Sequence, residues 1–296
     1  MTTANAEMLE KIKSGQGFIA ALDQSGGSTP KALKGYGIDE GEYSGDEEMF
    51  ALIHAMRSRI VTAPCFNGDK VIGAILFERT MDGEADGKPI PALLWERGVV
   101  PFLKVDKGLE AEADGVQLMK PNADLDALCE RAVAKGVFGT KMRSVVNLAN
   151  PVGVKAIVAQ QFAEAARIAA HGLVPIIEPE VNIKSPERDA ADRLLLSETL
   201  AALDAWTGAP VMLKLSLPTE AGLFQPLVDH PKVLRVVALS GGFARPEACA
   251  ELARNPGIIA SFSRALLEDL RASMSDAEFN GSLGGAIDEI HAASVA

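Results

Sequence analysis

Short apolar segments rich in Val, Ile and Leu recur along the chain, and most of them are too short for a helix. Their polar and apolar positions do not alternate cleanly, which is typical of parallel strands that helices cover on the outside. We therefore predict eight parallel strands. They run from Phe18 to Leu22, Val71 to Phe77, Val99 to Val105, Val137 to Val146, Leu173 to Glu178, Pro210 to Leu215, Val233 to Leu239 and Ile258 to Phe262.

Helical spacing of apolar residues fills several of the intervals between these strands. The clearest helix is predicted from Val154 to His171. A second is predicted from Pro186 to Trp206, with Ser185 as its expected N-cap. Ser275 and Glu278 have the spacing of a capping box before a final helical segment.

Strands that alternate with helices in a chain of 296 residues favour an α/β fold with a closed (β/α)8 barrel, the TIM barrel, over an open doubly wound sheet. No linker rich in Pro, Gly or Ser divides the chain, so residues 1–296 are interpreted as a single domain. Most predicted strands end in a charged or polar residue. Because the carboxyl ends of barrel strands form the catalytic face, these residues are the candidates for chemistry.

Composition narrows the choice of partners. A net charge of -11 gives no general attraction to nucleic acid or to anionic lipid. No uncharged apolar segment is long enough to cross a membrane, and no signal-like segment begins the sequence, so we expect a cytoplasmic protein with no membrane partner. Cys65, Cys129 and Cys249 lack paired or metal-type spacing and are interpreted as buried free thiols in a reducing compartment.

Lys214 is the most unusual lysine, because it lies between Leu213 and Leu215 inside a predicted strand. Such a lysine either reaches the surface by its flexible stem, where it pairs with a carboxylate, or lies in a low-dielectric environment. Burial and nearby cations lower a lysine pKa below its reference of about 10.4. Since a neutral amine can attack a carbonyl, we expect Lys214 to be a covalent nucleophile.

Other charged residues follow the same pattern. Lys104 and Lys141 occupy comparable positions in other predicted strands, and cations near a third lysine favour its neutral form. Lys141 and Arg143 are two residues apart, so both face the same side of a strand, and Glu178 and Glu180 repeat this relation. The carboxylates could exchange protons with reaction intermediates, or they could form a structural network with the lysines.

Two glycine and serine segments are candidate phosphate sites. Residues 26–28 (Gly-Gly-Ser) follow the first predicted strand, and residues 240–242 (Ser-Gly-Gly) follow the seventh. Glycines let backbone amides approach an anion, although a glycine after a strand more often serves a turn. The four histidines are dispersed, and no nucleotide-binding motif occurs, so we predict no metal and no cofactor.

Taken in order, eight segments resemble the class I fructose-bisphosphate aldolases, particularly their shorter bacterial form. The resemblance covers most of the chain. Its segments are Ala21 to Thr29, Val71 to Glu78, Gly98 to Gly108, Thr140 to Arg143, Ile176 to Glu180, Met212 to Lys214, Leu239 to Gly242 and Ser261 to Leu266.

The resemblance implies an enzyme that reversibly cleaves fructose 1,6-bisphosphate to dihydroxyacetone phosphate and glyceraldehyde 3-phosphate. Lys214 would form a Schiff base with the ketose, and Glu178 would move protons as the carbinolamine forms and loses water. Lys141 and Asp23 would assist cleavage of the carbon-carbon bond. The other matched residues would bind substrate, with Lys104, Arg143, Ser25 and Ser28 near the distal phosphate and hydroxyls, and Ser240, Gly241, Gly242 and Arg264 at the proximal phosphate.

The chain departs from the longer relatives at several positions. Gln24 stands where they have glutamate, and the pair after Lys214 is Leu-Ser rather than Pro-Asn. Ser263 is joined directly to Arg264, without two intervening residues. These departures resemble features of the bacterial branch.

The longer relatives also use a C-terminal tyrosine for proton exchange, whereas Tyr36 and Tyr43 are the only tyrosines of this chain. Protonation of the enamine must therefore use another group or water.

Two alternative functions fit the same residues. One is a related barrel lyase or transaldolase that uses imine chemistry on another sugar phosphate. The other is a non-catalytic protein that binds sugar phosphates.

Because relatives are often assemblies, the resemblance also implies a homo-oligomer.

Overall fold

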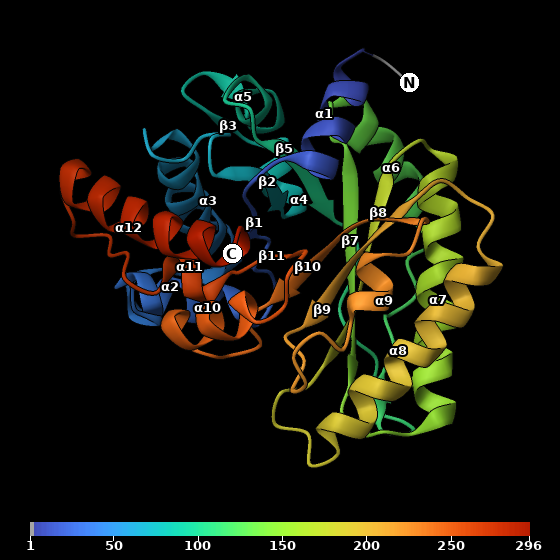
Figure 1. Ribbon diagram of the computed structural model, residues 1–296. Coiled ribbons are helices and arrows are strands. Elements are labelled where there is room, and N and C mark those ends of the chain that lie inside the picture. Colours follow the sequence, from blue (N-terminus) through green and yellow to red (C-terminus); the bar gives the residue numbers. More distant parts are fainter. Residues whose placement is uncertain (1–2) are drawn as a thin grey trace.

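The computed structural model describes residues 3–296, and its centre is a sheet of parallel strands (Figure 1). These strands are β1 (Phe18–Leu22), β2 (Val71–Leu76), β5 (Val100–Lys104), β7 (Gly139–Val146), β8 (Val174–Val181), β9 (Val211–Ser216), β10 (Val233–Leu239) and β11 (Ile258–Ala260). They neighbour one another in this order, and the short strand β6 (Val116–Gln117) adds to β7 in antiparallel orientation.

The two edges of the sheet meet between β1 and β11. Ala21 N of β1 donates to Phe262 O, just beyond the end of β11, at 3.1 Å. This hydrogen bond brings the sheet to a nearly closed barrel, which confirms the predicted (β/α)8 fold.

Helices surround the barrel on its outside (Figure 1). In Figure 1, α7 and α8 lie side by side next to β8, and α10, α11 and α12 lie on the opposite side of the molecule. The helices are α1 (Thr3–Ser14), α2 (Ser28–Tyr36), α3 (Gly45–Thr62), α4 (Glu78–Asp82), α5 (Ile90–Glu96), α6 (Leu125–Ala134), α7 (Pro151–Ala170), α8 (Arg188–Ala205), α9 (Gln225–Val228), α10 (Arg245–Ala253), α11 (Arg264–Leu267) and α12 (Asp276–Ser294), with a 3-10 turn at Glu40–Glu42 and a short hairpin of β3 (Glu84–Ala85) and β4 (Lys88–Pro89).

The predicted strands agree with the observed ones to within a few residues. β1 and β10 have the predicted bounds. β8 continues beyond its predicted end at Glu178, because β7 and β8 pair without interruption from Gly139 beside Val174 to Val146 beside Val181. The site residues at the end of β8 are therefore held in a strand rather than in a loop.

The helix starts were predicted less well. α7 begins earlier than Val154, because the side chain of Asn150 accepts hydrogen bonds from two backbone amides of its first turn. The prediction of Ser185 as N-cap of α8 is wrong, since Glu187 occupies that position. Ser185 Oγ instead donates to Asn147 O at 2.6 Å, which ties the segment to the loop after β7. The capping box of Ser275 and Glu278 at α12 is confirmed.

The interior of the barrel changes from apolar to charged along the strands. Buried apolar side chains fill its amino-terminal end, where Met8 and Ile12 of α1 pack against the strands. Side chains on one face of a strand recur every second residue. Two residues beyond Phe102, Ile176, Met212 and Ile259 of this apolar layer stand Lys104, Glu178, Lys214 and Ser261.

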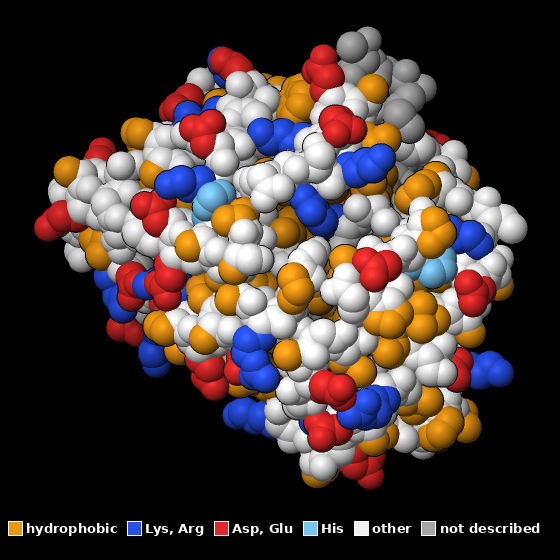
Figure 2. Space-filling view, viewed as in Figure 1, with side chains coloured by type: hydrophobic (Ala, Val, Ile, Leu, Met, Phe, Trp, Pro, Cys, Tyr) orange, Lys and Arg blue, Asp and Glu red, His pale blue; other side chains and the backbone are white. Residues whose placement is uncertain are grey.

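The outside of the barrel carries charges of both signs. On the face shown in Figure 2, Lys and Arg are interspersed with Asp and Glu. Among residues 3–296, every helix is too short or too polar to span a bilayer.

Candidate active site

A cavity of about 920 Å³ opens at the carboxyl ends of the barrel strands. The loops and strand ends after β1, β5, β7, β8, β9, β10 and β11 all contribute to its walls. The cavity therefore lies on the face that the fold favours for catalysis. The predicted site residues that line it are Asp23, Ser25, Ser28, Lys104, Lys141, Arg143, Glu178, Lys214, Ser240, Gly241 and Arg264.

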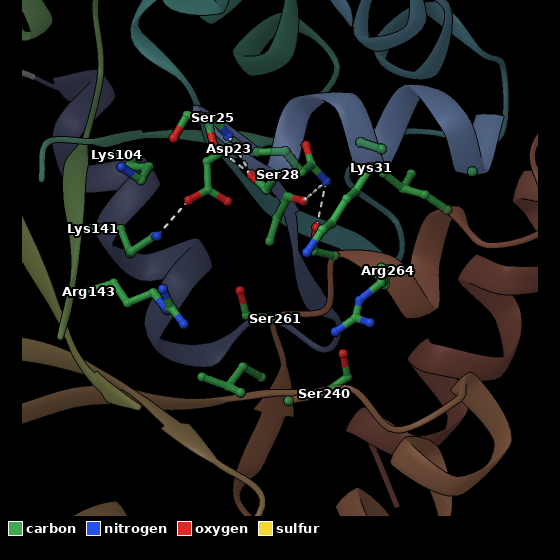
Figure 3. Close-up of a pocket in the computed structure, with 18 of the residues that line it drawn as sticks. Asp23, Ser25, Ser28, Lys31, Lys104, Lys141, Arg143, Ser240, Ser261 and Arg264 are labelled. Atoms are coloured by element: carbon green, nitrogen blue, oxygen red, sulfur yellow. Dashed lines mark hydrogen bonds and ion pairs between the residues drawn. The ribbon is translucent and has the colours of Figure 1, made fainter. Parts of the chain in front are cut away.

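Two lysines and two carboxylates form a compact cluster in the floor of this cavity. Lys214 Nζ lies 3.2 Å from Glu178 Oε1, and Lys141 Nζ lies 2.9 Å from Glu178 Oε2. Lys141 Nζ also lies 2.6 Å from Asp23 Oδ2, the ion pair drawn in Figure 3. Lys214 is only 4% exposed, and the other three residues are also buried. The structure therefore brings these four predicted site residues together.

Charge pairing within the cluster outweighs the cost of burial. Burial favours a neutral Asp23, but the ammonium groups of Lys141 and Lys214 hold the pKa of Asp23 well below its ordinary value. Burial likewise opposes the charge on Lys141, yet the Asp23 and Glu178 carboxylates raise the pKa of Lys141 above its ordinary value. Asp23 and Lys141 therefore form a permanently charged pair, and neither exchanges protons readily.

Glu178 is the member of the cluster that is placed to move protons. Its Oε2 contacts Lys141 but has no aligned hydrogen-bond donor in the described part of the chain, so a lone pair stays open. Its Oε1 lies beside Lys214. The sequence argument for a neutral Lys214 relied on burial and neighbouring cations, whereas the structure also places this buried carboxylate beside its Nζ. Glu178 can accept the proton that Lys214 must lose to become a nucleophile.

A glutamine of α7 holds Glu178 from behind. Gln161 is fully buried, and its Oε1 accepts a hydrogen bond from Glu178 N at 3.2 Å. Its Nε2 donates to Ser144 Oγ of β7 at 2.9 Å. The amide thus joins two neighbouring strands at the level of the charged cluster.

One wall of the cavity is basic and is braced by two carboxylates, Asp106 and Glu180. Lys104 Nζ pairs with Asp106 Oδ1 at 2.7 Å, and Asp106 Oδ2 accepts from Arg143 N at 3.2 Å. The Arg143 guanidinium in turn pairs with Glu180. Asp106 lies two residues beyond Lys104, so the two-residue period of a strand is the signal that could have found it, as it did for Glu180 after Glu178.

A second basic group lies across the cavity. Figure 3 shows Lys104, Lys141 and Arg143 on one side and Lys31 and Arg264 on the other. Lys31 lies one helical turn after Ser28 in α2, a spacing that the sequence analysis did not use. A ligand that spans the cavity therefore meets positive charge at both ends.

The glycine segment after β10 leaves space beside Arg264. Gly241 has a φ of 62°, and a Cβ there would lie 2.5 Å from Ile183 Cγ2, so a larger residue would not fit. Gly242 has a φ of 126° and lies beside Arg264, since a Cβ there would lie 3.4 Å from Arg264 Nη2, whereas Ser240 and Gly241 line the cavity.

The serines of the cavity differ in how their hydroxyl groups are used. Ser28 Oγ donates to Ser25 O at 2.8 Å and accepts from Ser25 N at 2.9 Å, so it fixes the loop after β1. Ser261 Oγ is buried without a hydrogen-bond partner among the described residues and points into the cavity (Figure 3). Its place after the last strand, on the inward face, is the signal that could have identified it.

Tyr36 also lines the cavity, near the end of α2. Its hydroxyl accepts a hydrogen bond from Arg59 at 3.3 Å, and its ring packs edge-on against Phe279.

Cys129 and Cys249 are buried and Cys65 is partly buried, and all three are free thiols. Residues 3–296 contain no group of three or more His, Cys, Asp or Glu side chains arranged to hold a metal ion.

Known proteins resemble the chain over nearly its whole length. The family model described as fructose-bisphosphate aldolase class-I matches residues 3–201. A curated protein of Porphyromonas gingivalis, named fructose-bisphosphate aldolase class 1, is 55% identical over 98% of this chain and 99% of its own length. A solved structure of fructose-bisphosphate aldolase from Plasmodium falciparum has a TM-score of 0.79 at 19% identity, and covers 99% of this chain and 95% of that one. This last likeness concerns the fold.

Proposed function

The chain belongs to the class I fructose-bisphosphate aldolase family, and we propose that Lys214 is the amine that forms the Schiff base with the ketose. The observation that carries the proposal is the position of Lys214 Nζ, buried in the floor of the cavity and 3.2 Å from a carboxylate. Metal-independent carbonyl chemistry of this kind needs an amine that is desolvated and has a base beside it.

The reaction begins when Glu178 takes the proton of Lys214. The neutral Nζ then attacks C2 of the ketose, and the carbinolamine loses water as Glu178 returns a proton to the leaving hydroxyl. The resulting iminium withdraws electrons from the C3-C4 bond. Glu178, again a carboxylate, accepts the proton of the C4 hydroxyl as that bond breaks to give an aldehyde and an enamine. Protonation of the enamine carbon and hydrolysis of the imine then release the second product.

Lys141 and Asp23 act together in the cleavage step. Because Lys141 keeps its charge, it stabilises the alkoxide that develops at C4 rather than serving as a base. Asp23 pairs with Lys141 at 2.6 Å and holds it in position. The predicted assistance of both residues in carbon-carbon cleavage thus takes the form of charge stabilisation.

The two basic sides of the cavity suit a substrate with a phosphate at each end. Lys104 and Arg143, together with the loop of Ser25 and Ser28, would face the distal phosphate and hydroxyls. Arg264 and the backbone of the segment 240–242 would hold the proximal phosphate, since guanidinium groups and glycine amides both bind phosphate oxygens.

Chemical trapping tests the assignment of Lys214. The protein is incubated with fructose 1,6-bisphosphate and borohydride, and the reduced adduct is mapped by peptide mass spectrometry. We expect the adduct on Lys214 and a loss of activity of about a thousandfold or more in Lys214→Met, because the covalent route is removed. Lys155→Met, an exposed lysine of α7, is the matched control and should retain wild-type activity. An adduct on another lysine would overturn the proposal.

Three further expectations belong to the same proposal. Residues 1–296 act as one domain, so the cavity residues should unfold in a single transition with the rest of the chain. The protein works in the cytoplasm, where its sugar-phosphate substrate is found. It assembles as a homo-oligomer, which light scattering would detect.

A further inference from the structure

A buried arginine behind the cavity fixes the orientation of the Gln24 side chain. Arg57 of α3 is 1% exposed, and its Nη1 donates to Thr80 Oγ1 at 2.9 Å. Its Nη2 donates to the backbone oxygen of Gln24 and, at 3.2 Å, to the side-chain Oε1 of Gln24. A guanidinium carries donors and no acceptor, so the Gln24 atom that faces it must be oxygen. The amide nitrogen must therefore face the other way.

On that other side lies Ser263. Gln24 Nε2 donates to Ser263 Oγ at 2.5 Å. Since an amide nitrogen only donates, Ser263 Oγ is the acceptor, and its own hydrogen is left to point elsewhere. Ser263 directly precedes Arg264, and both residues line the cavity. The hydrogen bonds from Arg57 to Gln24 and from Gln24 to Ser263 thus leave the Ser263 hydroxyl free to donate. It does so beside the guanidinium of Arg264.

We propose that Ser263 Oγ donates a hydrogen bond to the phosphate that Arg264 holds, and that Arg57 sets this polarity through Gln24. The proposal rests on the proposed function, which places the proximal phosphate at Arg264. Ser263 is a binding residue in this scheme, whereas Gln24 and Arg57 are positioning residues.

Two departures from the longer relatives meet in this contact. Gln24 stands where the longer relatives have glutamate, and its amide contacts Ser263, the residue joined directly to Arg264. A carboxylate at position 24 would accept from Ser263 and engage its only hydrogen, so no donor would be left for a phosphate.

Gln24→Glu tests the polarity with almost no change in size. A glutamate keeps the contacts with Arg57 and the fold, but it turns Ser263 from acceptor to donor. We expect the KM for fructose 1,6-bisphosphate and the inhibition constant of inorganic phosphate to rise about tenfold, the effect of one hydrogen bond to a charged group. The kcat should stay within about twofold of wild type. An unchanged inhibition constant would overturn the proposal.

A second variant separates hydrogen-bond polarity from the added charge. Ser263→Ala should raise the phosphate inhibition constant by a similar factor, and the double variant should resemble Ser263→Ala alone. If Gln24→Glu still weakens phosphate binding by the full factor in the Ser263→Ala background, repulsion by the carboxylate is the cause and the proposal is wrong.

The control is Gln16→Glu, the same change at an exposed position before the amino end of β1, away from the cavity. It should leave both constants at their wild-type values. Borohydride labelling distinguishes this proposal from the assignment of Lys214. Failure of that assignment leaves Lys214 of the wild-type protein without the label, whereas failure of this one leaves the label on Lys214 and abolishes the difference in phosphate inhibition.

Discussion

At the scale of single residues, spacing within strands predicted the charged cluster in the floor of the cavity. It did not predict the contacts between residues of different loops around that cluster. Asp23, Lys141, Glu178 and Lys214 follow apolar runs at the same ends of parallel strands, so the fold alone brings them together. The contact of Gln24 with Ser263 joins residues at opposite ends of the sequence. Its geometry depends on how the last loop turns, and no local pattern in the sequence records that turn.

Glu178→Gln tests the role of the carboxylate in proton transfer. Glutamine has the same size but cannot take the Lys214 proton, so we expect kcat to fall by about 100-fold or more. The rate of adduct trapping by borohydride should fall with it. Glu164→Gln, which alters a surface ion pair with Arg167 on α7, is the control and should keep the wild-type kcat. A variant that retains most of its trapping rate would rule out Glu178 as the proton acceptor.

At the scale of elements, strands were predicted more accurately than helix starts. A buried parallel strand is recognised by its own apolar residues, and β1 and β10 have their predicted bounds for that reason. The start of α8 depends on a distant partner. Ser185 Oγ donates to the distant Asn147 O and accepts from the N-cap residue Glu187 rather than from the first turn of the helix, and the sequence gives no sign of the contact with Asn147.

The capping box of α12 has a measurable effect on stability. Ser275 Oγ accepts from Glu278 N at 3.3 Å, and Glu278 reaches back to Ser275 N at 2.8 Å. Ser275→Ala should lower the free energy of unfolding by about 1 kcal/mol.

Chemical denaturation is the measurement for this change. Ser282→Ala in the middle of the same helix is the matched control, and it should leave stability unchanged or slightly raised because alanine favours helix interiors. Equal losses in the two variants would mean that the cap contributes nothing.

At the scale of the whole molecule, the free energy of unfolding depends on pH because two buried carboxylates have pKa values that are shifted in opposite directions. Asp23, whose pKa is lowered, stabilises the folded state above a pH of about 3.8, and this contribution is lost as the pH falls further. Burial, which Arg188 only partly offsets, raises the pKa of Asp192 from 3.8 to about 6. Its ionisation therefore costs folded-state stability as the pH rises through that window.

Asp192→Asn removes this second titration. Relative to wild type, the variant should gain free energy of unfolding between a pH of about 4 and about 6, by up to roughly 2–3 kcal/mol. Urea unfolding of both proteins across this range measures the difference. Asp204→Asn, whose side chain is 80% exposed, is the control and should follow the wild-type curve. A constant difference between wild type and Asp192→Asn at every pH would contradict the assignment.

The contact that closes the barrel, between β1 and the residues at the end of β11, also determines when the cavity forms during synthesis. A ribosome releases β1 first, and the strand that must cover its free edge is made last. Until residues 258–264 emerge, the nascent chain holds Lys214 but has neither Arg264 nor a finished cavity. The protein therefore gains its activity only after these residues emerge, and until then the edge of β1 is open to pairing with other chains.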